Sequence, residues 1–234
     1  MLTFLGILNP MRLAIVVPTL NEERAVRAYL ARARAEADQL IVSDGGSTDA
    51  TLDIAREMGA TVVIGSPGRG VQLNRGAAAA PNADILLFLH ADTVLPPGSG
   101  GAIRRAIEAG AAGGAFFVRF DADRPLFRLG NRIVNLRTRI TKRPLGDQAQ
   151  FVRRDVFEQL GGYRDWPILE DLDFAGRLNR AHGLALLPGP AVTAARRFVE
   201  GGITKTIATN WLIWLLFAFG VSPERLVRLY RQIR

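Results

Sequence analysis

ADILLFLHAD, at residues 83–92, runs from an almost wholly apolar segment directly into the polar residues His90 and Asp92. An apolar run without alternation indicates a strand that is buried on both faces, as in a mainly parallel sheet. Two similar runs precede it, RLAIVV (12–17) and QLIVS (39–43), and helix-like segments separate the three. The sequence therefore predicts an α/β fold in which helices flank a mainly parallel sheet.

Polar loops follow each of these strands at the point where the strand ends. They are PTLNEE (18–23), DGGSTD (44–49) and His90-Ala91-Asp92. Ligands of open α/β sheets bind beyond the carboxyl ends of the strands, so we expect the three loops to converge on one edge. Asp92 suits a hard divalent cation, Mg²⁺ or Mn²⁺, that would bridge a diphosphate. Each loop also fits the simpler role of a turn or helix cap.

The rest of the chain predicts further helices and strands. Helices are expected over 22–37, 49–58, 71–80, 98–109, 124–143, 153–160 and 170–181, and strands over 61–64, 113–120, 149–152, 184–187 and 192–198. The tail, 203–233, is expected to form two helices that separate at Ser222-Pro223. We expect a leader or misassigned start at 1–11, one domain over 12–200 and a helical appendage over 201–234.

The segment LEDLDF (169–174) places three acids at the start of an expected helix. The helix dipole favours acids there, which is the simplest explanation. The functional alternative is that one carboxylate serves as a general base. Glu170 and Asp171 lie ~100° apart around a helix, so they cannot share one role.

The composition excludes several kinds of site. The 234 residues include no cysteine and only two histidines, so disulfides and a zinc site of the usual His/Cys kind are not expected. The formal net charge of +8 favours anionic partners such as nucleotide diphosphates or acidic lipid headgroups. The longest apolar run near the end, WLIWLLFAF (211–219), is shorter than the ~20 residues of a membrane-spanning helix.

Basic and aromatic side chains occur together in the later part of the chain. Residues 124–143 carry seven Arg or Lys and no acid, and the tail adds arginines beside Trp211 and Trp214. Such helices are typical of membrane-surface elements, although a solvated helix face over an apolar core is the alternative. We expect a cytoplasmic protein that contacts the anionic inner face of the cell membrane and has no nucleic-acid partner.

Six segments together resemble the inverting family 2 glycosyltransferases, which have the GT-A fold. The segments, in the family's order, are IVVPTLNEE (15–23), IVSDGGSTDAT (41–51), GRGVQLNRGA (68–77), ILLFLHADT (85–93), GDQAQFVRRDVFEQLGGY (146–163) and ILEDLDFAGRL (168–178). The resemblance covers roughly residues 12–200. Within the family, the chain is similar to a small stand-alone bacterial subgroup with HAD in place of DXD. It implies a nucleotide-binding, Rossmann-like sheet and sugar transfer from a nucleotide diphosphate, commonly UDP, to an acceptor hydroxyl that is lipid-linked in some members.

The resemblance also implies roles for individual residues. Asp171 matches the catalytic base, and Asp92 matches the metal-binding last acid of DXD. The residues implied on the donor side are Pro18, Thr19, Asn21, Glu22, Asp44, Arg69, Asn74, Ala91, Asp92 and Arg197. Those implied on the acceptor side are Asp147, Gln148 and Glu170. The departure from the family pattern is His90, which replaces the first acid of DXD.

Rival functions lack parts of their own motifs. A dehydrogenase needs G-x-G-x-x-G after the first strand, and a P-loop NTPase needs G-K-[ST]; neither is present. A nucleotidyltransferase also joins acids, metal and nucleotide, and it is the enzymatic alternative. A basic RNA-binding protein, or a membrane-associated scaffold with a non-catalytic nucleotide fold, is the non-enzymatic one. Retention of Asp92 and Asp171 favours an enzyme.

Overall fold

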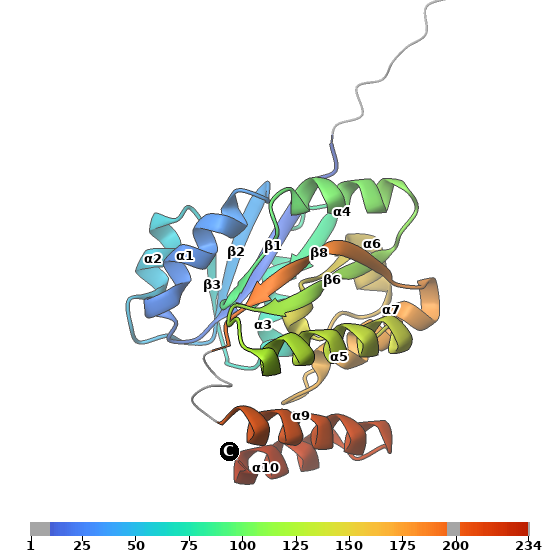
Figure 1. The fold of residues 1–234 in the computed structure, drawn as a ribbon. Helices are drawn as coiled ribbons and strands as arrows, with labels where there is room; N and C mark the ends of the chain where they lie inside the picture. Colours follow the sequence, from blue (N-terminus) through green and yellow to red (C-terminus); the bar gives the residue numbers. More distant parts are fainter. Residues whose placement is uncertain (1–9, 196–201, 234) are drawn as a thin grey trace, which may run out of the picture.

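A computed structural model describes residues 10–195 and 202–233 of the chain. Helices and strands alternate through the first half and give way to a mixed region and two tail helices (Figure 1). The strands are β1 (Leu13–Thr19), β2 (Gln39–Asp44), β3 (Thr61–Ile64), β4 (Ile85–Phe88), β5 (Thr93–Val94), β6 (Gly113–Phe120), β7 (Gln150–Arg153) and β8 (Ala185–Thr193). The helices are α1 (Glu23–Arg34), α2 (Thr51–Glu57), α3 (Arg69–Ala78), α4 (Ser99–Glu108), α5 (Pro125–Thr141), α6 (Arg154–Gln159), α7 (Glu170–His182), α9 (Ile203–Ala218) and α10 (Pro223–Ile233), with a 3₁₀ turn at Gly146–Gln148.

One sheet of eight strands, in the order β3-β2-β1-β4-β7-β6-β8-β5, runs through the molecule. The four strands β3, β2, β1 and β4 are parallel, as are β6 and β8. Strand β7 is antiparallel to both of its neighbours, and β5 is antiparallel to β8. The predicted α/β class with a mainly parallel sheet is therefore confirmed.

The apolar runs form strands because both of their faces are buried. In β1, Ile15 packs into one hydrophobic cluster and Val16 into the other. The same division holds in β4, where Leu87 and Phe88 belong to opposite clusters. A strand covered on both sides cannot alternate polar and apolar residues, which explains the continuous runs in the sequence.

The strand register brings the predicted loops to one edge. Thr19, the last residue of β1, pairs with Asp44, the last residue of β2. On the other side of β1, Val16 pairs with Phe88, so His90 and the residues after it continue past that same edge. The convergence of the three loops, which the sequence predicted, is thus a direct consequence of the parallel pairing.

The tail helices α9 and α10 lie side by side beneath α5 (Figure 1). The described residues include no helix that is long and apolar enough to cross a membrane. A different arrangement from the expected one appears before the tail. The two strands expected at 184–187 and 192–198 are one strand, β8, with an irregularity opposite Phe116 and Phe117. Residues 196–198 and the expected leader at 1–9 lie outside the described residues.

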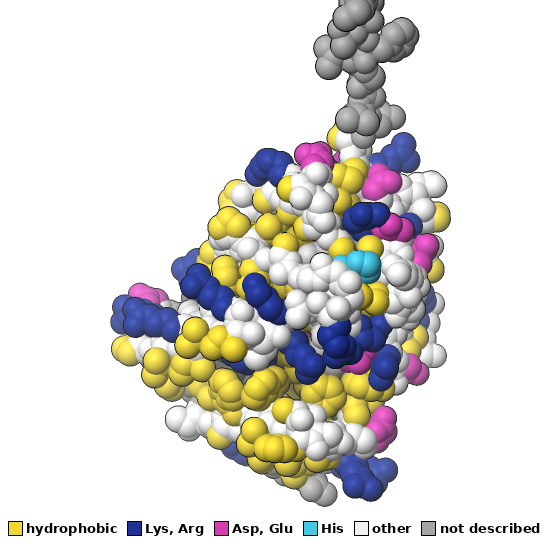
Figure 2. Space-filling view, turned by 90° about the vertical axis from the view of Figure 1, so that its right-hand side faces the viewer, with side chains coloured by type: hydrophobic (Ala, Val, Ile, Leu, Met, Phe, Trp, Pro, Cys, Tyr) yellow, Lys and Arg dark blue, Asp and Glu magenta, His cyan; other side chains and the backbone are white. Residues whose placement is uncertain are grey.

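Hydrophobic side chains gather on the surface near these helices. Figure 2 shows a band of them on one side of the molecule, with Lys and Arg side chains in a row above it. Exposed apolar residues of the helices are Leu129, Leu136 and Ile140 in α5, and Trp211, Leu212 and Leu215 in α9. This part of the molecule is both basic and apolar, as the sequence predicted for residues 124–143.

Candidate active site

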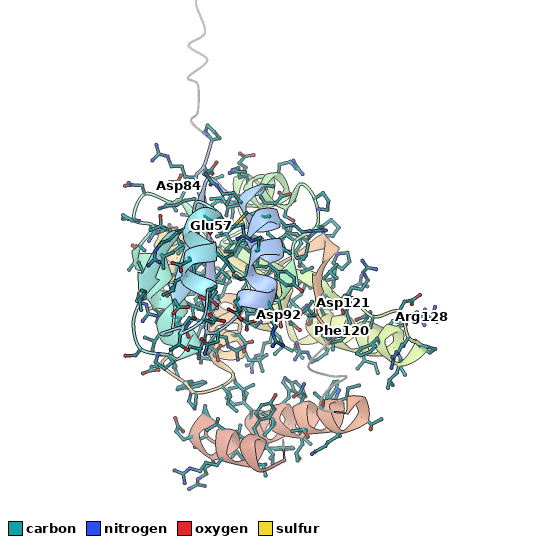
Figure 3. The ribbon with its side chains drawn as sticks, turned by 90° about the vertical axis from the view of Figure 1, so that its left-hand side faces the viewer. Glu57, Asp84, Asp92, Phe120, Asp121 and Arg128 are labelled. Carbon is teal, nitrogen blue, oxygen red and sulfur yellow. The ribbon has the colours of Figure 1, made fainter. Side chains whose placement is uncertain are left out.

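A cavity of about 380 Å³ lies beyond the sheet edge, between the sheet loops and helices α5 and α9. Four predicted site residues line it, namely Arg69, Asp92, Asp147 and Asp171. They come from the start of α3, the loop after β4, the 3₁₀ turn and the start of α7. Figure 3 shows Asp92 at the lower end of the sheet, on the side that faces α9 and α10, with Phe120 close by. Segments far apart in the sequence thus meet at one site.

Asp171 is held rigidly in the first turn of α7. Its Oδ2 accepts a hydrogen bond from the Gly146 amide at 2.7 Å, and its Oδ1 accepts one from the Leu172 amide at 2.7 Å. Only 6% of the residue is exposed. Leu169, immediately before the helix, has φ 65°, a left-handed conformation that is costly for a leucine. The sharp turn aims the carboxylate into the cavity, where a substrate hydroxyl can reach it.

Gly146 lies in close contact with the His90 imidazole. A Cβ built on Gly146 would overlap His90 Nε2 and lie 3.2 Å from Asp171 Oδ2. A side chain at position 146 would therefore force the imidazole or the loop to shift. The imidazole therefore covers the backbone segment that donates a hydrogen bond to Asp171, at the position where the resemblance predicts the first acid of DXD.

Glu170 and Asp171 point to different partners. Glu170 is 1% exposed, does not line the cavity, and forms an ion pair with Arg69, Oε1 to Nε 2.5 Å. Burial raises the pKa of Glu170 to about 7, against the lowering effect of Arg69. Burial alone would lower the pKa of Arg69, but the nearby Glu170 and Asp171 raise it. Glu170 therefore positions Arg69 at the cavity wall, and only Asp171 faces the space itself.

Asp147 and Arg137 both line the cavity, and their opposite charges interact. The Asp147 Oδ1 and the Arg137 Nε are both buried without a hydrogen-bond partner among the described residues. Burial and the neighbouring Asp171 raise the pKa of Asp147 to about 7, whereas burial lowers that of Arg137. The sequence did not single out Arg137. Its only signal was the basic amphipathic pattern of α5, which does not say which arginine turns inward.

The residues at the cavity fit a divalent cation that is shared with a substrate. The described residues hold no cluster of three His, Cys, Asp or Glu that could bind a metal without other ligands. They do supply hard carboxylate oxygens, from Asp92 and from the orphaned Oδ1 of Asp147. Mg²⁺ is usually bound by one or two carboxylates together with substrate phosphates and water. This donor set therefore suits Mg²⁺ or Mn²⁺ only when a phosphate-bearing ligand is present.

Asp44 organises the neighbouring loop. It is fully buried, and its two oxygens accept hydrogen bonds from the Thr19 hydroxyl, the Gly46 amide, and the amide and hydroxyl of Ser47, at 2.6–2.8 Å. Burial alone would raise the pKa of Asp44, but these bonds, led by those of Ser47, lower it. Base recognition by Asp44 stays a prediction, because the carboxylate's hydrogen bonds here all come from the protein.

The first two loops are tied together by further polar contacts. The Asn21 amide donates to Ser47 Oγ, and the Asn21 side chain accepts from the Thr48 amide; the Glu22 amide donates to Thr51 Oγ1. Pro18 sits half-buried at the end of β1. These residues surround the sheet edge but do not line the cavity. Their role as nucleotide contacts remains a prediction.

Comparison with known proteins places this geometry in a family. The sequence model of "Glycosyl transferase family 2" matches residues 14–161, more than half of the chain. The chain belongs to glycosyl transferase family 2. The match covers β1 through the site loops to α6, and it ends before the helix that carries Asp171.

Two curated relatives show the range of this family. An undecaprenyl-phosphate 4-deoxy-4-formamido-L-arabinose transferase of Aeromonas hydrophila is 36% identical over 115 residues, 43% of this chain and 34% of the relative. A PGL/p-HBAD biosynthesis glycosyltransferase of Mycobacterium bovis is 34% identical over 191 residues, 69% of this chain and 67% of the relative. The chain thus spans about a third of the first relative's length and two thirds of the second's.

Solved structures confirm that the fold is of the GT-A type. A mannosyltransferase of Pyrobaculum calidifontis, in complex with GDP-Man and Mn²⁺, aligns with a TM-score of 0.65 at 18% identity, over 93% of this chain and 67% of that one. Glucosyl-3-phosphoglycerate synthase of Mycobacterium tuberculosis, in complex with Mn²⁺, UDP-glucose and phosphoglyceric acid, aligns with a TM-score of 0.55 at 21% identity, over 78% and 72%.

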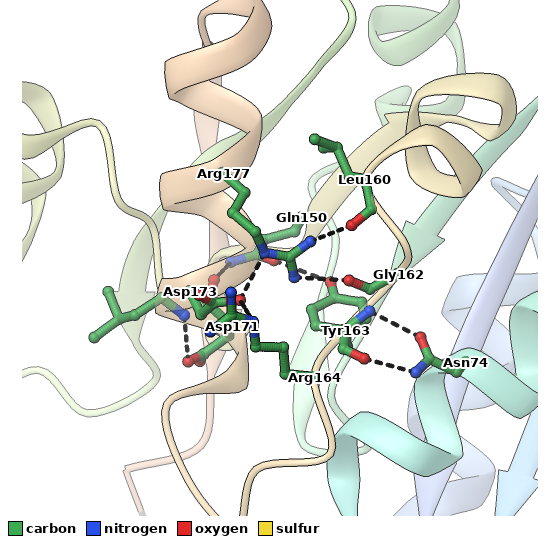
Figure 4. A network of polar contacts seen from close by, with 10 residues as sticks. Asn74, Gln150, Leu160, Gly162, Tyr163, Arg164, Asp171, Asp173 and Arg177 are labelled. Carbon is green, nitrogen blue, oxygen red and sulfur yellow. Dashed lines mark hydrogen bonds and ion pairs between the residues drawn. The ribbon is translucent and has the colours of Figure 1, made fainter. Parts of the chain in front are cut away.

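In this family 2 chain, Asn74 supports the site instead of lining it. Its side-chain amide bonds to both the amide and the carbonyl of Tyr163, at 2.9 and 2.8 Å. Arg177 adds bonds to the carbonyls of Leu160 and Gly162 (Figure 4). Together they fix the segment that leads into the helix of Asp171. The donor-side role of Asn74 stays a prediction, and in this structure its side chain is bonded to the Tyr163 backbone.

Gln148 is likewise an internal support. It is fully buried, and it bonds to the Thr138 hydroxyl at 2.9 Å and to the Phe116 carbonyl at 3.1 Å. These bonds join the 3₁₀ turn to α5 and β6. Gln148 would have to break them before its side chain could contact an acceptor, as the sequence predicted. Ala91 is buried between His90 and Asp92. Arg197, predicted at the diphosphate, lies outside the described residues together with Arg196.

Two residues that the sequence did not single out bond to the backbone at the ends of β1 and β2. Gln72 donates to the carbonyls of Thr19 and Ser43, both at 2.9 Å, at the ends of β1 and β2. Arg75 donates to the carbonyl of Asp44 at 2.7 Å. Both lie in α3, within the segment GRGVQLNRGA that carries the family resemblance.

Proposed function

We propose that this chain is an inverting glycosyltransferase that moves a sugar from a nucleotide diphosphate, UDP in the first instance, to an acceptor hydroxyl. The observation that carries the proposal is the meeting of Asp92, Asp171 and Arg69 in one cavity at the carboxyl edge of the sheet. The family membership supports it. The solved relatives add support, because their complexes hold GDP-Man or UDP-glucose with Mn²⁺.

Asp171 is the proposed base. Each of its oxygens accepts one backbone hydrogen bond, which leaves further lone pairs for a substrate proton. It takes the proton of an acceptor hydroxyl, and the freed oxygen attacks the anomeric carbon on the face opposite the nucleotide. The bond from that carbon to the diphosphate breaks, and the product has inverted configuration. General-base catalysis of this kind typically contributes ~10²–10⁴-fold in rate.

The donor side neutralises the diphosphate as it leaves. Arg69 is oriented by Glu170 and supplies a fixed positive charge at the cavity wall. A divalent Mg²⁺ or Mn²⁺ held through Asp92 would supply further charge neutralisation to the diphosphate. Asp147, at the same wall, keeps a carboxyl next to the acceptor position, where it orients a hydroxyl by hydrogen bonding.

Nucleotide binding tests the donor half of the proposal. Thermal unfolding of the protein is measured with UDP, UDP-sugars, GDP-sugars and CTP, each with and without Mn²⁺. A metal-dependent rise in Tm with a nucleotide sugar is expected, and Asp92→Asn is expected to abolish the metal-dependent part. Asp123→Asn, an exposed acid outside the cavity, is the matched control. Equal stabilisation with and without EDTA would contradict the assignment of Asp92.

Turnover tests the base. Release of UDP from UDP-sugars is followed for the wild type and for Asp171→Asn. The variant is expected to bind donor as the wild type does, and to lose about 10²–10⁴-fold in turnover. Wild-type transfer by this variant would refute the assignment. Stabilisation by CTP alone, with release of pyrophosphate, would favour the nucleotidyltransferase alternative.

We also propose that the basic, apolar face of α5 and α9 contacts an anionic membrane, which would place the protein on the inner face of the cell membrane. Ile140 is 74% exposed and Phe219 is 80% exposed, and α5 carries Arg128, Arg132 and Arg139. Neither residue lines the cavity. The double variant Ile140→Glu/Phe219→Glu is expected to sediment less with anionic liposomes than the wild type. Salt-independent or absent sedimentation of the wild type would contradict the proposal.

A further inference from the structure

The cavity at the acid cluster continues into an apolar slot between α5 and the tail helices. On the α5 side its wall is made of Leu126, Leu129, Gly130, Ile133, Val134 and Arg137, which fall on one helical face. The opposite wall includes Ile207, Trp211 and Trp214 of α9 and Tyr230 of α10. From Leu126 to Arg137 the α5 wall is ~16 Å long, at 1.5 Å per residue. One end of the slot is therefore apolar and the other is charged.

Apolar side chains of this wall are left in contact with solvent. Leu129 is 52% exposed and Ile133 is 41% exposed, although both belong to the inward-facing row of α5. Trp211, across the slot, is 37% exposed. Exposed apolar surface that lines a concave site is favourable only when a ligand covers it. The volume of about 380 Å³ is within the ~300–1,000 Å³ range of small-molecule sites.

Gly130 keeps the middle of the slot open. A Cβ built on this residue meets no atom within 4 Å. Its φ is not in the left-handed region, so the backbone does not require glycine there. Glycine inside a helix is destabilising relative to alanine, so the fold gains nothing from it. Gly130 thus leaves space in the slot that a larger side chain would fill.

Arg137 sits where the apolar wall meets the acid cluster. Its Nε is buried without a hydrogen-bond partner among the described residues, and its Nη2 donates to the carbonyl of Arg143 at 3.0 Å. A buried guanidinium with an unused donor is suited to an anionic oxygen of a ligand. The α5 segment adds Arg128, Arg132 and Arg139 and no acid.

We propose that the slot holds the hydrocarbon chain of an anionic amphiphilic acceptor, with its anionic group at Arg137 and its reacting hydroxyl at Asp171. This assignment rests on the proposed glycosyl transfer and names the acceptor class for the same site. The charge complementarity at Arg137 and the continuity of the slot with Asp171 identify the ligand as an acceptor lipid, and the apolar walls bury its chain. The donor nucleotide occupies the other side of the acid cluster, near Asp44.

Tryptophan fluorescence tests the slot without any need for turnover. Terminally brominated dodecyl phosphate, below its micellar concentration, is titrated into the full-length protein, because bromine quenches tryptophans that it contacts. Trp211 and Trp214 line the slot, so saturable quenching is expected. Gly130→Leu fills the open space and is expected to weaken binding at least about tenfold. Leu is a better helix former than Gly, so this variant should unfold no more easily than the wild type.

Matched variants separate occupancy from other effects. Gly130→Ala adds only a methyl group, and it should keep near wild-type quenching with a slightly raised Tm. Arg137→Gln should weaken binding of the phosphate probe, Arg137→Lys should restore part of it, and Arg132→Gln, an exposed charge on the same helix, should leave it unchanged. A neutral probe, terminally brominated dodecyl maltoside, should bind more weakly than the phosphate.

Two outcomes would overturn the assignment. Wild-type quenching in Gly130→Leu would show that the probe binds only the outer apolar surface. Equal binding of the maltoside and phosphate probes would show that Arg137 does not recognise an anionic group of the ligand. The UDP-sugar and Mn²⁺ thermal shift of Gly130→Leu is measured in parallel. If that shift is absent in the wild type while the slot binds the probe, the donor proposal fails and the slot stands; the converse result refutes the slot alone.

Discussion

Gly146→Ala tests the contact between His90 and the loop that holds Asp171. The added Cβ would overlap His90 Nε2 and lie 2.8 Å from Cε1, closer than real carbon atoms approach. The backbone at Gly146 is not left-handed, so alanine brings no conformational strain of its own. Whatever the substitution costs must therefore come from the displaced imidazole or from a shifted loop.

The size of the effect follows from those two contributions. Overpacking a buried position costs about 1–3 kcal/mol. If the loop moves, the hydrogen bond from the Gly146 amide to Asp171 Oδ2, now 2.7 Å, is lost as well, at about 1.5–3 kcal/mol for a bond to a charged group. In a His90→Ala background the two nearest atoms are absent. Of the three nearest atoms, Asp171 Oδ2 at 3.2 Å then remains, and small adjustments can relieve that approach.

A double-mutant cycle in urea measures this coupling. The free energy of unfolding is compared for the wild type, Gly146→Ala, His90→Ala and the double variant. We expect Gly146→Ala to cost much less in the His90→Ala background, with a coupling energy of about 1–3 kcal/mol. Two substitutions that add within about 0.5 kcal/mol would refute the contact. Turnover of UDP-sugars should follow the same order, because Asp171 loses its amide donor only when the His90 imidazole and the added methyl group compete for space.

Three further predictions concern single residues. In EDTA, the free energy of unfolding of the wild type should fall as pH rises from about 4 to 7. Asp147 and Glu170 both have folded pKa values of about 7, so over this range they stay protonated in the folded state and lose the proton on unfolding. Asp147→Asn should reduce the slope of that part of a urea-midpoint profile, and the contribution of Glu170 should remain. Asp44→Asn should lose about 1.5–3 kcal/mol at neutral pH, and this difference should shrink in acid, because the lowered pKa of Asp44 stabilises the fold only above its ordinary range. Lys142→Gly should raise the free energy of unfolding, measured by chemical denaturation, by up to about 1 kcal/mol. Lys142 ends α5 in the left-handed region, with φ 52°, where glycine is unstrained; Lys142→Ala should not raise it.

The sequence predicted what depends on local pattern. Strands β1 and β4 were visible because burial on both faces leaves an unbroken apolar run, and Asp92 was visible because it ends such a run. The direction of individual side chains was not predictable. Asn74 turns to the Tyr163 backbone and Arg137 turns into the cavity, and each choice depends on neighbours from distant segments. The slot was invisible for the same reason, since it exists only once α9 and α10 pack beneath α5.

The family resemblance predicts an acid at position 90, and the geometry gives a physical reason for the imidazole that stands there. An acid at position 90 would add a negative charge beside Asp92, Asp147 and Asp171, and the pKa of Asp147 is already raised by burial and then by its acidic neighbours. An imidazole adds no negative charge, and its ring covers the Gly146 backbone that donates to Asp171. The loop that carries Asp92 is thereby in contact with the loop whose amide donates to Asp171. A substitution at His90 should therefore alter the hydrogen bonding of Asp171, and the double-mutant cycle measures that coupling.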